Sequence, residues 1–239
     1  MELHKAVSSR HFYLKILFYF IKWDVIINDI PTPRDPATKS SIFADDSSAW
    51  RSGKNIGLLS REIQKHLDKV SSWADKWGFK LSETKTTAVL FTNSLKIDLS
   101  SIKLSIKGIN IKLANEAKFL GVTFDRRLTW GIHITNVETK CKKTINLMRS
   151  VSGNKWGASK KALLIIYRTL IRSRLDYGCE AYYTASKIHL AKLDQIQSAC
   201  LRICCGAFKG TATSALQQDC GEMSLCLRRK RNITHSLLK

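Results

Sequence analysis

Two adjacent carboxylates, Asp45 and Asp46, are the residues whose type and spacing point most directly to chemistry. They follow the short apolar run Ile42-Phe43-Ala44 and precede a polar stretch. If the chain doubles back here, the pair lies on a tight turn at a sheet edge, where its charges repel unless a cation lies between them. Mg²⁺ prefers such oxygen ligands, and paired metal ions drive in-line phosphoryl chemistry. An Asp-Asp pair is also common in solvated turns, so the rest of the chain must decide.

The charge balance narrows the class of partner. The 239 residues include 40 Lys and Arg but only 19 Asp and Glu, a net charge of +21, while 44% hydrophobic residues indicate a globular chain. This excess excludes an ordinary enzyme of small neutral metabolites and favours a polyanion, either nucleic acid or an anionic membrane surface. Residues 118–239 hold 22 of the basic residues and 7 of the acidic ones. The C-terminal half is therefore the stronger candidate for binding phosphates.

Seven cysteines, an odd number with loose spacing, do not form the pattern of a disulfide framework. They favour a reducing, intracellular compartment, without distinguishing nucleus from cytoplasm. Cys200 and Cys204 fall on the apolar face of an expected helix, where buried free thiols are common. The late cysteines lack the Cys-x-x-Cys and His-pair spacings of zinc sites, so a zinc site is not expected there.

The N-terminal part predicts a strand and a loop. Residues 12–21 form the most apolar run, but Lys15 interrupts it and it is shorter than the ~20 residues that a membrane span needs. A buried strand or a short helix is expected there instead. Residues 25–30 predict a further strand, and Pro31, Pro33 and Pro36 then enforce a loop.

Periodicity predicts the remaining elements. Apolar residues recur every three to four positions over 56–77, which indicates an amphipathic helix that buries Leu67, Val70 and Trp77 and ends at Gly78. Strands are expected at 88–91 and 117–124, with a hairpin around Lys107-Gly108. Later apolar stripes predict helices over 134–151, 162–175 and 188–205. The expected fold class is α+β, with an all-α fold as the second choice.

Several motifs in order carry a resemblance. They are Ile27-Asn28-Asp29-Ile30-Pro31, Phe43-Ala44-Asp45-Asp46, Ser82-Glu83-Thr84-Lys85-Thr86, Lys118-Phe119-Leu120-Gly121-Val122-Thr123-Phe124-Asp125, Leu128-Thr129-Trp130-Gly131-Ile132-His133-Ile134 and Arg174-Leu175-Asp176-Tyr177-Gly178. Each motif alone is weak, but their order and distances resemble the reverse transcriptase of non-LTR retrotransposons, particularly the jockey-like elements of insects. The resemblance runs from about Trp23 to the C-terminus.

The resemblance implies a partial right-hand polymerase. Asp45 would bridge two Mg²⁺ (or Mn²⁺) ions in the turn of the palm, with Asp46 beside it. Lys85 would lie where the family carries a lysine thought to act on the leaving pyrophosphate, although a solvated charge at a strand end explains it equally well. Residues 119–130 would form the hairpin that positions the primer end. The implied partners are an RNA template, a DNA primer and deoxynucleoside triphosphates, with no membrane.

The helices after residue 130 resemble the thumb, which tracks the template–primer duplex through its phosphates. Lys161, Arg168 and Arg172, spaced by seven and four residues, share one helical stripe suited to that role. Lys118, Lys140 and Lys143 are expected to bind nucleic acid with them. An ordinary charged surface would produce the same pattern, but the basic excess of this half favours phosphate binding.

Departures from the family limit what can be expected of this chain. The family has a third metal-binding Asp on an upstream palm strand and a Pro-Gln-Gly-type segment, and the sequence matches neither. The expected organisation is therefore an unassigned apolar segment 1–22, a partial palm 23–130, a helical thumb-like region 131–206 and a truncated C-terminal extension 207–239. The missing palm and fingers would leave the helix 56–77 loosely packed, and Asp24 is the only candidate to replace the absent carboxylate.

These expectations lead to one main interpretation and two alternatives. The main interpretation is an RNA-directed DNA polymerase fragment whose family performs two-metal nucleotidyl transfer to a primer 3′-hydroxyl, with the chain inactive by itself. A non-catalytic remnant that binds nucleic acid is the principal alternative. A nuclease that uses the Asp pair is less favoured, because no nearby His or Glu cluster supports it.

Overall fold

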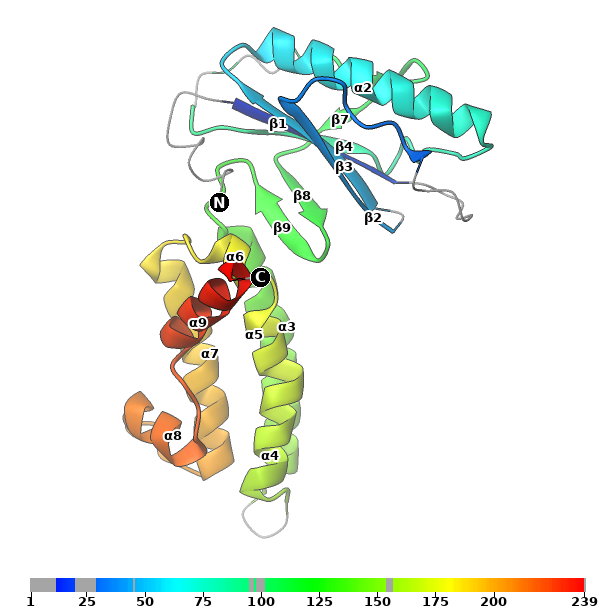
Figure 1. Ribbon diagram of the computed structural model, residues 1–239. Coiled ribbons are helices and arrows are strands. Elements are labelled where there is room, and N and C mark those ends of the chain that lie inside the picture. The colour runs from blue at the N-terminus through cyan, green and yellow to red at the C-terminus, as the bar shows by residue number, and fades with distance from the viewer. Residues whose placement is uncertain are drawn as a thin grey trace. The chain divides into compact units, whose positions relative to one another are not determined.

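The chain folds into two compact units, Met1–Leu128 and Thr129–Lys239. The computed structural model describes residues 12–19, 29–44, 46–94, 97, 102–153 and 157–238. The first unit is a sheet covered by a helix, and the second is helical (Figure 1). The expected α+β class is therefore confirmed. The strand expected at residues 25–30 falls mostly outside the described residues.

The main sheet has five strands in the order β2-β3-β1-β4-β7. β1 lies at its centre, antiparallel to β3 on one side and to β4 on the other, while β4 and β7 run parallel. Two small hairpins, β5-β6 and β8-β9, complete the unit. The strands are β1 (Phe12–Tyr19), β2 (Thr38–Phe43), β3 (Asp46–Gly53), β4 (Thr87–Phe91), β5 (Ser105–Ile106), β6 (Ile109–Asn110), β7 (Lys112–Leu113), β8 (Glu116–Phe119) and β9 (Val122–Asp125).

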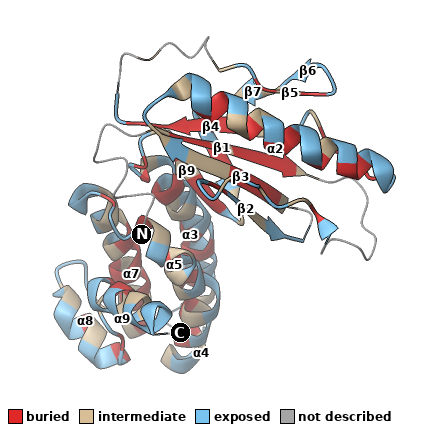
Figure 2. Ribbon diagram, turned by 45° about the horizontal axis from the view of Figure 1, so that its top comes forward, coloured by how far each residue is buried: buried red, intermediate tan, exposed pale blue. Residues whose placement is uncertain are grey.

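Helix α2 (Ile56–Lys76) covers one face of the sheet (Figure 1). It begins at Asn55, whose side chain accepts a hydrogen bond from the Leu58 N–H at 3.1 Å and so caps the first turn. Its buried stripe faces the strands and its exposed residues face away (Figure 2). The core between α2 and β1 is apolar and includes Leu14, Ile16, Phe18, Leu59, Ile63, Leu67 and Val70.

Two expectations about this core are wrong. Trp77 is 43% exposed, because the helix ends at Lys76, and the buried tryptophan is Trp73, which stacks on Phe79 with 5.1 Å between ring centroids. The expected loose packing also fails. Residues 12–19 supply the central strand, and Leu14 and Ile16 are fully buried against the helix.

The opposite face of β1 is covered by the β8-β9 hairpin. Lys15 lies over the rings of Phe119 and Phe124, and the Tyr19 hydroxyl donates to the Lys118 carbonyl at 3.3 Å. The single strand expected over 117–124 is wrong: the chain reverses at Leu120 and Gly121, both of which have positive φ. The hairpin expected around Lys107-Gly108 is confirmed as β5-β6.

The second unit is built on two long helices that pack side by side, α3 and α7 (Figure 1). Serine side chains cap α4, α7 and α9 at their N-termini, as the sequence around Ser159, Ser186 and Ser224 allows. The helices are α3 (Gly131–Val151), α4 (Lys160–Ile166), the π-helix η3 (Tyr167–Arg172), α5 (Ser173–Asp176), α6 (Cys179–Tyr182), α7 (Lys187–Cys205), α8 (Thr213–Cys220) and α9 (Leu225–Leu237).

The helix expected over 162–175 is present but not uniform. Its middle, Tyr167–Arg172, is a π-helix, in which each hydrogen-bonded turn holds one residue more than an α-helical turn. Tyr167 and Ile171 from this segment are fully buried. In the part of the chain that the structure describes, no helix combines the length and the apolar character needed to cross a membrane.

Candidate active site and nucleic-acid interface

The Asp pair lies where strands β2 and β3 meet. The two strands are antiparallel with Phe43 opposite Asp46, so the chain reverses between these two residues. Ala44 takes a positive φ of 55°, which a tight reversal of the chain requires here. Asp45 lies outside the described residues. Asp46 is half-buried at the start of β3, directly opposite Tyr19 at the end of β1.

The Ser82–Thr86 motif reaches the same end of the sheet. The Ser82 N–H donates to the Tyr19 carbonyl at 2.8 Å. The segment then turns, and both the Thr86 N–H and the Thr86 hydroxyl donate to the Ser82 carbonyl, at 3.0 and 2.6 Å. Lys85 is exposed in this turn. Three segments distant in sequence, the 43–46 turn, the end of β1 and the Lys85 turn, therefore meet at one end of the sheet.

The described residues at this end offer few carboxylates for a pair of metal ions: Asp46 in the 43–46 turn and Glu83 in the Lys85 turn. Two ions about 3.5–4 Å apart need carboxylates from more than one strand. β1, the second neighbour of β3 in the sheet, carries no carboxylate between Phe12 and Tyr19, and it presents Tyr19 opposite Asp46. The described residues of this turn therefore supply one carboxylate, that of Asp46.

Three acidic residues precede the Asp pair in this part of the sequence, Asp24, Asp29 and Asp35. Asp35 forms an ion pair with Arg51. The Ala37 N–H, which donates to the Asp35 carboxylate at 2.9 Å, and the Arg51 guanidinium hold the pKa of that carboxyl below its usual range. Asp29 is exposed before the proline loop, and Asp24 lies outside the described residues. Asp35 therefore lies beside Arg51, toward the opposite end of β3 from Asp46.

Lys15, which interrupts the apolar run of residues 12–21, lies in the middle of β1. Its ammonium nitrogen lies 4.3 Å from the ring centroid of Phe119, 5.3 Å from that of Phe124 and 5.5 Å from that of Trp50. Burial lowers the pKa of Lys15 to about 8. The same face of the sheet carries Tyr19 and Asp46, because residues alternate along β1 and pair across to β3. The sequence signal for this buried ammonium group was a lysine inside an otherwise apolar strand.

Four of the six residues expected to bind nucleic acid present their side chains to solvent. Lys118 is exposed on β8, Lys140 and Lys143 on α3, and Lys161 on α4. Their role in binding nucleic acid stays a prediction. Their exposure is compatible with contacts to phosphates.

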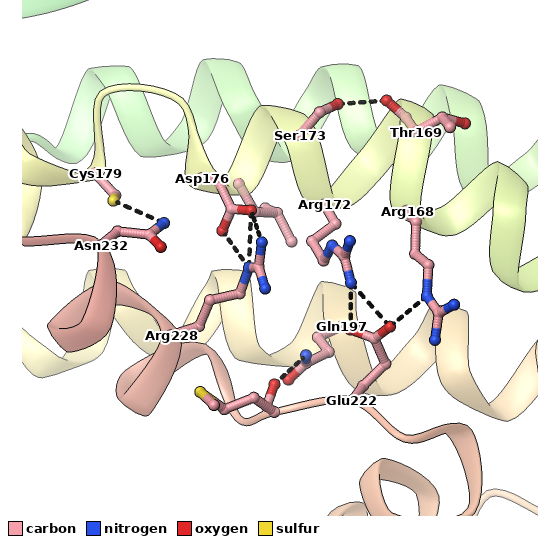
Figure 3. Close-up of polar contacts among 12 residues, drawn as sticks. Arg168, Thr169, Arg172, Ser173, Asp176, Cys179, Gln197, Glu222, Arg228 and Asn232 are labelled. Carbon is pink, nitrogen blue, oxygen red and sulfur yellow. Dashed lines mark hydrogen bonds and ion pairs between the residues drawn. The ribbon is translucent and has the colours of Figure 1, made fainter. Parts of the chain in front are cut away.

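Arg168 and Arg172 instead bind a carboxylate of the same chain. The Arg168 Nε lies 2.7 Å from Glu222 Oε1, and the Arg172 Nη1 lies 3.0 Å from both carboxylate oxygens (Figure 3). The Glu222 side chain is only 2% exposed. The two arginines therefore neutralise a buried charge. Their role in phosphate binding stays a prediction, and binding a phosphate would compete with their contacts to Glu222.

A polar network surrounds this carboxylate. Gln197 on α7 donates to the Tyr167 hydroxyl at 3.1 Å and to the Met223 carbonyl at 3.0 Å. The Asp176 carboxylate accepts two-pronged hydrogen bonds from Arg228 on α9 at 2.6 to 2.8 Å (Figure 3). Asp176 belongs to the Arg174–Gly178 motif. The motif thus fastens α9 to α5, a function that the linear sequence did not reveal.

Comparison with known proteins finds relatives among mobile elements. The chain is 28% identical over 204 residues to the "RNA-directed DNA polymerase from mobile element jockey" of Drosophila melanogaster, covering 82% of this chain and 22% of that protein. It is 25% identical to the "Probable RNA-directed DNA polymerase from transposon X-element" of the same species, covering 80% and 21%. It is also 25% identical to the "Retrovirus-related Pol polyprotein from type-1 retrotransposable element R1 2" of Nasonia vitripennis, covering 73% and 44%.

These similarities confirm the resemblance to the reverse transcriptases of non-LTR retrotransposons that the motifs predicted. No family model matches the chain. The chain spans about a fifth of the length of the two fly relatives. The activity of those whole proteins is therefore not established for this chain.

Proposed function

We propose that this chain is a palm and thumb portion of an RNA-directed DNA polymerase of a jockey-like retrotransposon. The observation that carries the proposal is the convergence of the 43–46 turn, the end of β1 and the Lys85 turn at one end of the sheet. In such a polymerase, Asp45 and Asp46 would bind Mg²⁺ or Mn²⁺, which supplies charge neutralisation to the reacting phosphates. The RNA template, DNA primer and deoxynucleoside triphosphates are the proposed partners.

The residues of this end have different proposed tasks. Lys85, exposed in its turn, would neutralise phosphate charge near the triphosphate. The β8-β9 hairpin, fastened to β1 through Tyr19 and Lys15, would hold a primer end beside the carboxylates. The exposed lysines of α3 and α4 would bind the duplex through its phosphates. All of these side chains would bind or orient the substrates, and none of them supplies a further carboxylate.

Because β1, the neighbour of β3, presents Tyr19 opposite Asp46 and carries no carboxylate, we expect this chain to show no primer extension by itself. The test compares the chain with a chimera that carries the upstream palm and fingers of the jockey polymerase, each with and without Asp45→Asn. Extension is expected only in the chimera that keeps Asp45. Extension by the chain alone that disappears in Asp45→Asn would contradict this expectation, and its loss in Asp24→Asn would identify the missing ligand.

A non-catalytic, nucleic-acid-binding role is the second candidate function. The exposed lysines Lys140, Lys143 and Lys161, together with the absence of a carboxylate from β1, favour it. The same chimera separates the two. If it binds template–primer but fails to extend it with Asp45 intact, the turn has lost its catalytic role and the binding function is favoured.

A further inference from the structure

Two cysteines that lie far apart in the late sequence meet in the helical unit. Cys205 is the last residue of α7 and Cys220 is the last residue of α8, and their sulfur atoms are 3.1 Å apart. Asp219 brings a carboxylate to the same place. The ligand atoms of the three residues all lie within 4.8 Å of one another. The spacing of the cysteines in the sequence gave no zinc motif, because the ligands come from the ends of two helices.

We propose that Cys205, Cys220 and Asp219 form a Zn²⁺ site that fastens the end of α8 to the end of α7. Two thiolates and one carboxylate are ligands that zinc takes in proteins, with Zn–S distances of about 2.3 Å. Two sulfurs on a tetrahedral zinc ion are about 3.7 Å apart. The present pair, at 3.1 Å, needs to open by about 0.6 Å, which a small side-chain rotation provides. Solvent supplies the fourth ligand.

The surroundings match such an ion. Zinc binding removes the protons of both thiols, so the three ligands contribute a charge of −3 and the occupied site a charge of −1. Lys160 balances this charge: its ammonium lies 2.7 Å from Asp219 Oδ1 and 3.0 Å from the Asp219 carbonyl. A hydrogen-bonded partner of this kind orients a ligating carboxylate.

The site is also accessible from one side. Asp219 is 58% exposed, Cys205 is half-buried and Cys220 is buried. A hydrated ion can therefore approach from the Asp219 side and reach the sulfurs behind it. Zinc binds the thiolate form of cysteine, so binding at this site releases protons from the thiols.

The test measures bound zinc in the full chain, kept reduced with a phosphine that leaves thiols free. After dialysis against buffer, one zinc ion per chain is expected, and Co²⁺ in its place should give thiolate-to-cobalt charge-transfer absorption. Cys205→Ser and Asp219→Asn should each weaken zinc binding by at least tenfold. Cys226→Ser, which removes an exposed thiol on α9, is the matched control and should change nothing.

The exposed position of Asp219 makes Asp219→Asn a variant that keeps the fold, so the test does not depend on replacing a buried cysteine. The proposal would be overturned if the parent chain bound no zinc. It would also be overturned if Cys205→Ser and Asp219→Asn both bound zinc as tightly as the parent chain. A disulfide between Cys205 and Cys220 that persists under the reductant would also overturn it, because those sulfurs could not then bind a metal. The result is independent of primer extension.

Discussion

The two units of the chain handle charge in opposite ways. Between β1 and α2 the first unit packs mostly apolar side chains, although α2 also buries His66, and its acidic residue of interest, Asp46, lies at the sheet end. The second unit buries a carboxylate, Glu222, and surrounds it with Arg168 and Arg172. A core of the first kind depends on side-chain shape, whereas one of the second kind depends on keeping every charge paired. Positive charge counted from sequence therefore overstates what the second unit offers to a polyanion.

The largest effect is expected where the first unit depends on shape. Trp73→Ala should lower the free energy of unfolding by about 4 kcal/mol, because it removes a buried ring that stacks on Phe79. Chemical denaturation followed by circular dichroism measures it. Trp77→Ala is the matched control on the same helix and should cost less than about 1 kcal/mol, since that ring is largely exposed. Equal losses in the two variants would show that the packing of α2 differs from the one described.

The second unit should be sensitive to the loss of a charge. Glu222→Gln should lower the free energy of unfolding by about 3 kcal/mol, because it leaves two arginines without their shared carboxylate. The control is Glu138→Gln, which weakens partly exposed pairs with Lys142 and Lys192 and should cost less than about 1 kcal/mol. If Glu222→Gln behaves like the control, the buried ion pairs do not hold η3 and the segment before α9 together.

Lys15 is the exception to the apolar character of the first unit, and it gives that unit a pH dependence. Its pKa is about 8 when folded and about 10.4 when unfolded, so between these values the unfolded chain binds more protons and the free energy of unfolding rises with pH. Below pH 8 the lysine is charged in both states and the folded chain bears the cost of burying it. Lys15→Met should raise stability at pH 7 by about 2 kcal/mol, after allowance for the attraction of the rings.

Denaturation at pH 7 and pH 10 measures this difference. The gain from Lys15→Met should shrink as the pH approaches 10, because the lysine of the parent chain is then neutral in the folded state. Lys54→Met, at an exposed lysine of the same unit, supplies the control and should show no such trend. A gain that is the same at both pH values would mean that Lys15 is solvated in the folded chain.

The smallest effect concerns the exposed lysines of the second unit. Neutralising Lys140, Lys143 and Lys161 together to Gln should weaken binding to an RNA–DNA duplex by about 1 kcal/mol at fixed salt and reduce the slope of log affinity against log salt by about one per lysine. Arg168 and Arg172 are left intact, because their loss would also disturb Glu222. The control changes Lys54, Lys69 and Lys76 to Gln in the first unit. An unchanged slope in the first triple variant would contradict phosphate binding by α3 and α4.

Local periodicity was enough to predict most elements. The apolar repeats over 56–77 and 188–205 correspond to α2 and α7, and Cys200 and Cys204 are buried in α7 as expected. Contacts between distant segments were not predictable in this way. The position of β1 beside β3, the pairing of Glu222 with two arginines and the meeting of Cys205 with Cys220 depend on tertiary structure, and no short spacing in the sequence specifies them.

Two predictions from local sequence patterns were wrong because of where the backbone turns or where a helix ends. The Leu120-Gly121 reversal splits an apolar run that looks like one strand, because a run of this length fits a single strand or a tight hairpin equally well. Trp77 continues the apolar period of α2, yet the helix ends one residue before it. The candidate site shows the same division between local and tertiary information. The motifs and their order can be read from the sequence, but their meeting at one end of the sheet depends on the register of β1 against β3.

The π-helix Tyr167–Arg172 has a consequence for comparing this chain with its relatives. A π-helical turn accommodates one residue more than an α-helical turn while both ends of the helix continue on nearly the same axis. A relative with a continuous α-helix here would be one residue shorter and would still present the equivalents of Ile166 and Asp176 to the same neighbours. An alignment without a gap would then shift every residue after the turn by one position, about 100° around the helix axis, and pair Asp176 with the wrong counterpart.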